Sequence, residues 1–423
     1  MALRLFEGYG VELEYMIVDA ATLRVRPVAD VLLKRAAGAA EEEWPSDYDV
    51  PGTGITWSNE LTAHLIELKT SEPVRSLTGL AAAFSDSVRR ANALLCEQGC
   101  RLMPGAMHPF MDPLTEKTLW PHDSSEYYEA FDRIFDCRGH GWANLQSCHL
   151  NLPFEGDEEF GRLHAAIRLI LPILPALAAS SPIMDGRATG TLDNRLAVYR
   201  TNARKVPSVS GRVIPEPVFT RADYTREILE RIYADLAPHD PEGILREEWA
   251  NARGAIARFT RGSIEIRVLD VQECPAADMA IVFAVVAVLK DLVRERWTDL
   301  AAQRAWEVEP LERVLLACIE EADGAVIRDG AYLETLGIRG QAACTAGEVW
   351  RHLVEASVSK AEEAEEFMPA LRVMLDEGPL ARRIERAVAA RGGDRAAMES
   401  VYTDLCGCVA AAPERGGGMF RGA

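Results

Sequence analysis

The segment Gly10-Val11-Glu12-Leu13-Glu14-Tyr15-Met16-Ile17-Val18-Asp19 has the alternating pattern of a β-strand, with two acidic residues inside it. Side chains of a strand alternate between its faces, so Glu12 and Glu14 share one face, about 7 Å apart, while the apolar residues between them point into a core. Two ionised carboxylates at that distance repel, and water, an arginine or a divalent metal must offset the repulsion. Taken alone, the segment is compatible with a solvated strand face or with a cation site.

The composition is that of a globular protein able to bury a full core, with 423 residues, 48% of them hydrophobic and 26% charged. A formal net charge of -19 argues against a nucleic-acid surface built on bulk basicity. Nine scattered cysteines, an odd number, favour reduced thiols over a disulfide framework. The pattern of a secretory signal and a long apolar run are both missing, so we expect a cytoplasmic protein without a membrane partner, and homo-oligomerisation stays open.

Strand patterns are concentrated in the first 270 residues and helical patterns dominate the rest. We expect a hairpin over Phe6 to Val28, strands within 55–70, 143–154 and 255–270, and helices over 77–96 and 158–179, the second divided at Pro172 and Pro175. Residues 180–217 lack periodicity and predict a long functional loop. This suggests an α+β catalytic core over 1–298, a helical C-terminal region over 299–409 packed on the core, and a disordered tail over 410–423.

Three further segments place polar residues inside strand-like runs. In the segment 57–68, Glu60 and Glu67 have opposite strand parity, so they face one site only if a bend intervenes. In the segment 144–152, His149 and Asn151 project from one face, although a single histidine is often only a hydrogen-bonded structural residue. In the segment 263–270, Glu265 and Arg267 share a face, which is also the pattern of an ordinary salt bridge.

Together these segments supply five glutamates and a histidine, with arginines in the neighbouring loops. Oxygen-rich ligand sets suit Mg²⁺ or Mn²⁺, and arginines donate forked hydrogen bonds to phosphates and carboxylates. This inventory suits phosphoryl transfer from ATP, in which metal ions and arginines stabilise the moving charge. The sequence contains neither GxxxxGK[ST] nor GxGxxG, so the nucleotide site is not a P-loop or a dinucleotide fold.

The order of these segments resembles the glutamate-cysteine ligase and carboxylate-amine ligase family, within the glutamine synthetase-like fold. The resemblance runs from Phe6 to Pro275 and rests on Gly-Val-Glu-Leu-Glu at 10–14, Glu60 with Ile-Glu-Leu at 66–68, His-Leu-Asn at 149–151, Ala-Ser-Ser-Pro at 179–182 followed by Gly-Arg at 186–187, and Ile-Glu-Ile-Arg at 264–267. It implies a curved, largely antiparallel sheet with flanking helices and a helical C-terminal region. One face of that sheet would hold ATP, two or three Mg²⁺ or Mn²⁺ ions and an amino acid.

The resemblance also implies roles for individual residues. Glu14, Glu60 and Glu67 correspond to the ligands of one metal ion, and Glu12, His149 and Glu265 to those of another. Arg267 resembles the family's phosphate or substrate-carboxylate arginine, and Arg267 and Glu265 are the expected catalytic residues. The remaining substrate-binding or phosphate-binding positions are Arg187, Arg200, Asn151, Arg258 and Arg261.

The implied reaction begins with attack of a carboxylate, typically the γ-carboxylate of glutamate, on the γ-phosphate of ATP. An amine such as that of cysteine then displaces phosphate from the acyl phosphate, under cover of the loop 180–217, which would exclude water. A cysteine-binding motif is missing and the helical C-terminal part has no counterpart in the resemblance, so the amine stays open. Two alternatives remain, a kinase-like enzyme that stops at a phosphorylated product, as guanidino kinases do, and a non-catalytic sensor of ATP or amino acids.

Overall fold

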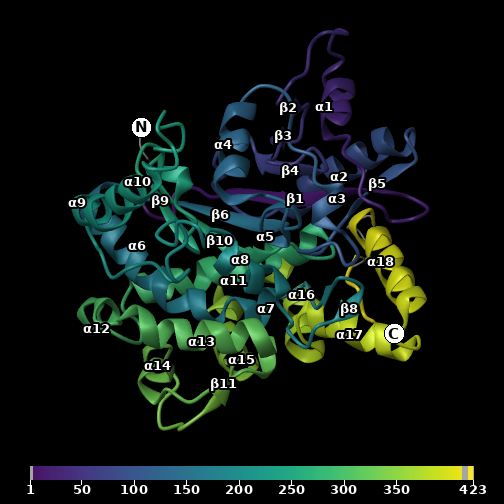
Figure 1. Ribbon diagram of the computed structural model, residues 1–423. Coiled ribbons are helices and arrows are strands. Elements are labelled where there is room, and N and C mark those ends of the chain that lie inside the picture. Colours follow the sequence, from purple (N-terminus) through teal and green to yellow (C-terminus); the bar gives the residue numbers. More distant parts are fainter. Residues whose placement is uncertain (1–2, 412–417, 423) are drawn as a thin grey trace.

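The computed structural model describes residues 3–411 and 418–422, and these form an α+β fold around an eight-stranded antiparallel sheet (Figure 1). Its strands run in the order β2-β3-β4-β1-β6-β10-β9, and β5 also pairs with β1. Their bounds are β1 (Gly10–Asp19), β2 (Asp47–Val50), β3 (Ile55–Asn59), β4 (Leu65–Thr70), β5 (Cys100–Met103), β6 (Ser147–Pro153), β9 (Ala255–Arg258) and β10 (Ser263–Asp270). The expected α+β class with a largely antiparallel sheet is confirmed.

Two short ladders lie outside this sheet, one of β7 (Ile183–Met184) with β8 (Arg187–Ala188) and one of β11 (Val326–Ile327) with β12 (Cys344–Thr345). The helices of the first 298 residues are α1 (Ala29–Ala37), α2 (Leu80–Cys96), α3 (Pro113–Glu116), α4 (Ser125–Phe135), α5 (His140–Ala143), α6 (Gly156–Ile170), α7 (Pro175–Ala178), α8 (Asn194–Asn202), α9 (Arg221–Tyr224), α10 (Glu230–Leu236) and α11 (Pro275–Val293). Those that follow are α12 (Leu300–Arg304), α13 (Val308–Glu321), α14 (Gly330–Thr335), α15 (Ala346–Ala356), α16 (Ala364–Glu377), α17 (Leu380–Ala390) and α18 (Arg395–Val409). Single turns of other helix types lie at η1 (Leu171–Ile173), η2 (Thr225–Leu229), η3 (Glu248–Ala250), η4 (Ala322–Gly324) and η5 (Val358–Lys360).

The central strand β1 separates the core from the polar face of the sheet. Val11, Leu13, Tyr15 and Ile17 are buried in the main hydrophobic cluster, to which α2, α6 and α11 also contribute. Glu12 and Glu14 lie on the opposite face, as the alternation predicts. The same face carries Met16 and Val18 further along β1, and these two residues belong to a second hydrophobic cluster.

Prolines divide the helical segment 158–179 as predicted. The helix α6 ends at Ile170, the single 3₁₀ turn η1 contains Pro172, and α7 begins at Pro175. Proline has no backbone N–H to donate and its ring clashes with the preceding turn, so each proline starts a new segment.

The expected hairpin over Phe6 to Val28 forms only at its tip, where the backbone N–H of Asp19 donates to the carbonyl oxygen of Arg24 and that of Arg26 to the carbonyl oxygen of Ile17. After the turn, the returning chain makes only one isolated bridge, Val18 to Val25, and then enters α1. The reason is that β4 occupies this edge of β1 from Glu12 to Met16, so little of the strand is left for the return.

The segment 180–217 is not the structureless loop that its composition suggested. It forms the β7–β8 ladder and the helix α8, whose N-terminus is capped by Asp193 accepting a hydrogen bond from the backbone N–H of Leu196. Periodicity gives no signal for α8, because its apolar residues are consecutive, Leu196 to Tyr199, and are not spaced three or four apart.

The C-terminal helices pack on both faces of the sheet. The helices α13, α15 and α16 join the main hydrophobic cluster, with Phe367 of α16 stacked on Phe283 of α11 at 4.3 Å between ring centroids. Residues of α17 and α18 join Met16 and Val18 in a second cluster on the other face. In Figure 1, α13 and α15 lie below the sheet while α18 lies beside β5.

The predicted disordered tail falls partly outside the described residues, which exclude 412–417 and 423. For residues 418–422 the prediction is wrong, because Phe420 is buried in the second cluster and its carbonyl oxygen accepts a hydrogen bond from Arg383. No helix within the described residues combines the length and apolarity needed to cross a bilayer.

Candidate active site

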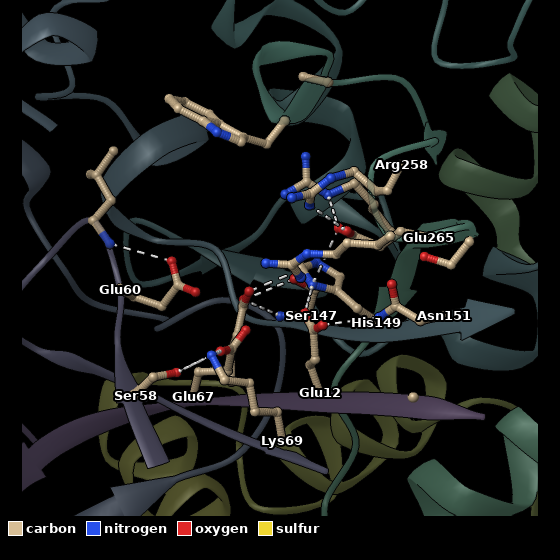
Figure 2. A pocket seen from close by; sticks show the side chains of 18 of the residues that line it. Glu12, Ser58, Glu60, Glu67, Lys69, Ser147, His149, Asn151, Arg258 and Glu265 are labelled. Atoms are coloured by element: carbon tan, nitrogen blue, oxygen red, sulfur yellow. Dashed lines mark hydrogen bonds and ion pairs between the residues drawn. The ribbon is translucent and has the colours of Figure 1, made fainter. Parts of the chain in front are cut away.

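The polar face of the sheet forms the floor of a cleft of about 1390 Å³. This exceeds the roughly 300–1,000 Å³ of a typical small-molecule pocket and leaves room for more than one ligand. Ten of the twelve candidate residues from the sequence line it, and Figure 2 labels seven of these ten. The ten are Glu12, Glu14, Glu60, Glu67, His149, Asn151, Arg258, Arg261, Glu265 and Arg267.

Strand register brings the polar residues together. Glu12 of β1 stands opposite His149 of β6, and Glu14 stands opposite Glu67 of β4. On the other side of β6, Asn151 stands opposite Glu265 of β10. Residues directly opposite each other in an antiparallel pair have side chains on the same face, so four separate chain segments deliver their polar groups to one floor.

The first compact group consists of Glu12, His149 and Glu265, each offering a ligand atom within 4.8 Å of the others. His149 Nδ1 lies 2.9 Å from Glu12 Oε2, and Asn151 Nδ2 donates to Glu12 Oε1 over 2.9 Å. Burial opposes a charged imidazole, but the surrounding carboxylates, led by Glu12, raise the pKa of His149 to about 9. Because a metal ligand must be a neutral imidazole, a proton and a metal ion compete for this ring.

The second compact group consists of Glu14, Glu67 and the same His149, again within 4.8 Å. The backbone N–H and the hydroxyl of Ser147 donate to Glu14 Oε2 over 2.6 and 2.8 Å. Lys69 Nζ lies 2.7 Å from Glu67 Oε2, which also accepts from the Ser58 hydroxyl over 2.6 Å. Burial, followed by the charge of Glu12, nevertheless raises the pKa of Glu67 to about 7.

Glu60 lies in the bend between β3 and β4, which end at Asn59 and begin at Leu65. The predicted bend is therefore present. The carboxylate of Glu60 faces the cleft, but among the described residues it is not part of either compact group. Burial, together with the charges of Glu14 and Glu67, raises the pKa of Glu60 well above its ordinary value.

Arginines from β9 and β10 flank Glu265. Arg258 Nη1 lies 3.2 Å from Glu265 Oε2, and Arg267 Nε lies 2.8 Å from Glu265 Oε1. Arg261, in the turn between the two strands, also lines the cleft. These guanidinium groups gather positive charge on one side of the floor, where the phosphates of a nucleotide would find donors.

Two predicted substrate arginines do not reach the cleft, and this corrects the sequence-based assignment. Arg187 is exposed on β8, and Arg200 points from α8 toward Glu312 of α13, 3.9 Å away. For Arg200 the formation of α8 is the reason, because a helix turns successive side chains by about 100°. Arg195, Tyr199 and Asn202, at spacings i, i+4 and i+7, line the cleft instead.

Several other residues that line the cleft have no assignment from the sequence. Lys69 follows Glu67 by two positions on β4, and this strand parity was the signal that could have identified it. Aromatic residues from α4, α5 and η3 also line the cleft. No local sequence pattern indicates that these three segments meet there.

The donor set fits divalent metal ions of the Mg²⁺ or Mn²⁺ kind. Five glutamates and one histidine line the floor: Glu12, Glu14, Glu60, Glu67, Glu265 and His149. Lys69, Arg258 and Arg267 ion-pair with two of these glutamates, so negative charge remains for additional cations. Carboxylate oxygens with an imidazole are the ligands that such ions accept.

Comparison with known proteins agrees with this chemistry. Residues 9–404 match the family described as glutamate-cysteine ligase family 2 (GCS2). A protein of Archaeoglobus fulgidus, described as uncharacterized, is 35% identical over 70% of this chain and 77% of its own length. A protein of Rubrobacter xylanophilus named “Putative glutamate--cysteine ligase 2-3” is 26% identical over 91% of this chain and 90% of its own.

Solved structures show the same fold. A glutamate-cysteine ligase of Francisella tularensis in complex with AMP superimposes with a TM-score of 0.57 at 14% identity, covering 98% of this chain and 95% of that one. A bifunctional glutathione synthetase of Pasteurella multocida gives a TM-score of 0.56 at 14% identity, covering 95% of this chain and 52% of that one.

Proposed function

Because the chain belongs to glutamate-cysteine ligase family 2, we propose that it joins the γ-carboxylate of glutamate to an amine in a reaction driven by ATP. At the level of the family, it is an ATP-dependent carboxylate-amine ligase that uses a divalent metal. The identity of the carboxylate and of the amine, and the roles of single residues, are our proposal.

One observation carries the proposal: two compact ligand groups share His149 on the floor of a cleft whose far side holds three arginines. Metal ions held by these two groups, together with the arginines, can neutralise the negative charges along a triphosphate. We assign Glu12, His149 and Glu265 to one metal ion, and Glu14 and Glu67, with Glu60 beside them, to another. When bound, these ions supply charge neutralisation for the phosphates; Mg²⁺ and Mn²⁺ are both suited to the donors.

The protein's own residues perform the positioning. Arg258, Arg261 and Arg267 bind the phosphates and stabilise the charge that develops as the glutamate carboxylate attacks the γ-phosphate. ADP leaves, and an acyl phosphate remains. The amine nitrogen then forms a bond to the acyl carbon, the carbon–oxygen bond to phosphate breaks, phosphate leaves with the electron pair, and the protons of the amine pass to water.

Exclusion of water protects the acyl phosphate from hydrolysis. Tyr199 and Asn202 of α8 line the cleft, and we assign this helix the covering role expected of the loop 180–217. We place the reaction in the cytoplasm, with small amino-acid substrates.

The experiment combines the purified full chain with ATP, Mg²⁺, glutamate and a panel of amines, and measures ADP by a coupled assay and products by mass spectrometry. We expect glutamate-dependent ADP release in step with an amide of glutamate and the amine. A stable phosphorylated product without free phosphate would indicate a kinase instead. Tight ATP binding without any turnover across the panel would refute the ligase assignment.

A further inference from the structure

A lysine on β4 supplies positive charge to the floor of the cleft from the side opposite the arginines. Among the described residues, the lysine and arginine side chains that line the cleft are those of Lys69, Arg195, Arg258, Arg261 and Arg267. The last three belong to β9, to β10 and to the turn between these strands, whereas Arg195 belongs to α8. The sheet order β4-β1-β6-β10 places two strands between the strand of Lys69 and β10.

This order separates Lys69 from the arginines of β9 and β10. Neighbouring strands lie about 4.8 Å apart, so the backbones of β4 and β10 are roughly 14 Å apart. Figure 2 shows Lys69 at the lower edge of the labelled group and Arg258 on the opposite side. The strands β1 and β6, which carry Glu12, Glu14 and His149, lie between them. Positive charge therefore flanks the acidic floor on two sides.

The ammonium group of Lys69 is held in place and still has a free donor. Its Nζ donates to Glu67 Oε2 and to Ser58 Oγ, over 2.7 Å each. The Ser58 hydroxyl donates to the same Oε2 over 2.6 Å, which fixes this arrangement. An ammonium group has three N–H donors, and within the described part of the chain the third finds no acceptor. The Lys69 side chain is 36% exposed and lines the cleft, so this donor is accessible to a ligand.

The arginines of the cleft have other partners. Arg195 is buried and donates to Asp270 and to the carbonyl oxygen of Arg267. Arg258 and Arg267 contact the two oxygens of Glu265, and the proposed function assigns both, with Arg261, to the phosphates. Among the described residues of the cleft, Lys69 is therefore the cation that remains for a further anion.

A donor substrate with two carboxylates brings such an anion into the cleft. In the proposed reaction one carboxylate attacks the γ-phosphate, and glutamate keeps a second one that takes no part in the bond changes. Because five glutamates line the floor, a second carboxylate without a cationic partner would lose its hydration and be repelled. An ammonium group with a free N–H offers it a charge-assisted hydrogen bond.

We propose that Lys69 binds the non-reacting carboxylate of the donor substrate, so that the enzyme selects dicarboxylates such as glutamate. This inference rests on the proposed function and deepens it, because it names the residue that selects the donor. Glu67 and Ser58 hold the ammonium group in position for this contact. Lys69 thus determines specificity and leaves the transfer of the phosphoryl group to the metal ions and the arginines.

The test compares three donors with the full chain, saturating ATP and Mg²⁺, and an amine that supports turnover. 4-Aminobutyrate is glutamate without the α-carboxylate, and butyrate also lacks the amino group, which gives it the same net charge as glutamate. We expect Lys69→Gln to lower kcat/KM for glutamate about tenfold or more, and to change kcat/KM for 4-aminobutyrate and butyrate less than about twofold. Equal losses for glutamate and butyrate would show a general change in the field of the floor and would overturn the proposal.

Two further variants control for charge and for folding. Lys69→Arg keeps the charge and should keep kcat/KM for glutamate within about threefold of the unchanged protein. Lys117→Gln is the matched control, because Lys117 pairs with Asp132 over 2.6 Å but does not line the cleft, and it should leave all three donors unaffected. A higher KM for ATP in Lys69→Gln, with kcat/KM for glutamate unchanged at saturating ATP, would place Lys69 at the phosphates and would overturn the proposal.

Failure of the proposed function is distinguishable from failure of this inference. If no amine supports glutamate-dependent ADP release, the ligase assignment fails. Calorimetric titration of glutamate into the protein with Mn²⁺ and a non-hydrolysable ATP analogue then still tests Lys69. A dissociation constant for glutamate that rises about tenfold in Lys69→Gln, while that for butyrate stays the same, supports the assignment. Equal constants for glutamate in the two proteins, or no binding of glutamate to the unchanged protein, overturn it.

Discussion

Replacing Asp270 with asparagine should destabilise the protein strongly, because Asp270 anchors the end of β10, the strand that carries Arg267. The buried Asp270 accepts hydrogen bonds from the backbone N–H of Ser180 over 2.8 Å, from the Ser181 hydroxyl over 3.1 Å and from Arg195 Nη1 over 3.3 Å. Arg195 Nη2 in turn donates to the carbonyl oxygen of Arg267 over 2.7 Å, where the register of β10 shifts.

The magnitude follows from what Asp270→Asn leaves behind. The two carboxylate oxygens of Asp270 face only hydrogen-bond donors. The amide of the new asparagine must therefore turn its N–H₂ group toward one of these donors. Burial raises the pKa of Asp270 even though Arg195 lies beside it. The Asp270–Arg195 ion pair therefore stabilises the protein little more than apolar packing would. Removing one partner nevertheless leaves the Arg195 charge buried and uncompensated, which costs about 3–5 kcal/mol of unfolding free energy.

Urea unfolding at pH 7, followed by tryptophan fluorescence, measures this loss. Asp278→Asn is the matched control, because Asp278 is equally buried, accepts from the backbone N–H of Gln272, and burial raises its pKa well above the ordinary value. Because Asp278 has no cationic partner among the described residues, its replacement by an amide should change the unfolding free energy by less than about 1 kcal/mol. Equal losses in the two variants would refute the anchoring role of the Asp270–Arg195 pair.

Three other predictions concern the metal site and the response to pH. Glu265→Gln should abolish ATP-dependent turnover and weaken Mn²⁺ binding, measured by electron paramagnetic resonance, while an unchanged urea midpoint excludes misfolding; retained Mn²⁺ affinity would contradict the ligand assignment. Lys69→Gln removes the cation that shares Glu67 Oε2, so the dissociation constant for Mn²⁺ should fall about tenfold, whereas Lys69→Arg should leave it unchanged. Burial lowers the pKa of His64 from 6.5 to about 4, so the unfolded chain binds a proton before the folded chain does as the pH falls. The free energy of unfolding should therefore decrease by about 3 kcal/mol between pH 6.5 and pH 4. His64→Gln should make the urea midpoint depend less steeply on pH across that range. An unchanged slope would contradict the assignment of this pH dependence to His64.

Local periodicity was enough to predict the features that depend on one segment. Alternation in 10–19 placed Glu12 and Glu14 on one face, and the opposite parity of Glu60 and Glu67 required the bend that the structure contains. Pro172 and Pro175 divided their helix as expected. Each of these follows from backbone geometry or from a missing N–H group, which neighbouring residues alone determine.

The hairpin after β1 and the loop 180–217 could not be predicted in this way. Residues 24–28 have a strand-like pattern, yet β4, which follows some 40 residues later, occupies the edge they would need. No local pattern distinguishes the arginines of 180–217 from one another. In the structure, α8 turns Arg195 toward the cleft and Arg200 toward Glu312.

The sequence by itself therefore determined which residues could be ligands, because residue type and strand parity limit what each side chain can reach. Only the tertiary structure decided which of them meet. Register placed Glu12 opposite His149 and Glu14 opposite Glu67, and it let one histidine belong to both groups. The aromatic residues that line the cleft come from α4, α5 and η3, three segments that share no local pattern. Pairing and packing between residues far apart in the chain select one register and one helix orientation, and no window of neighbouring residues contains that information.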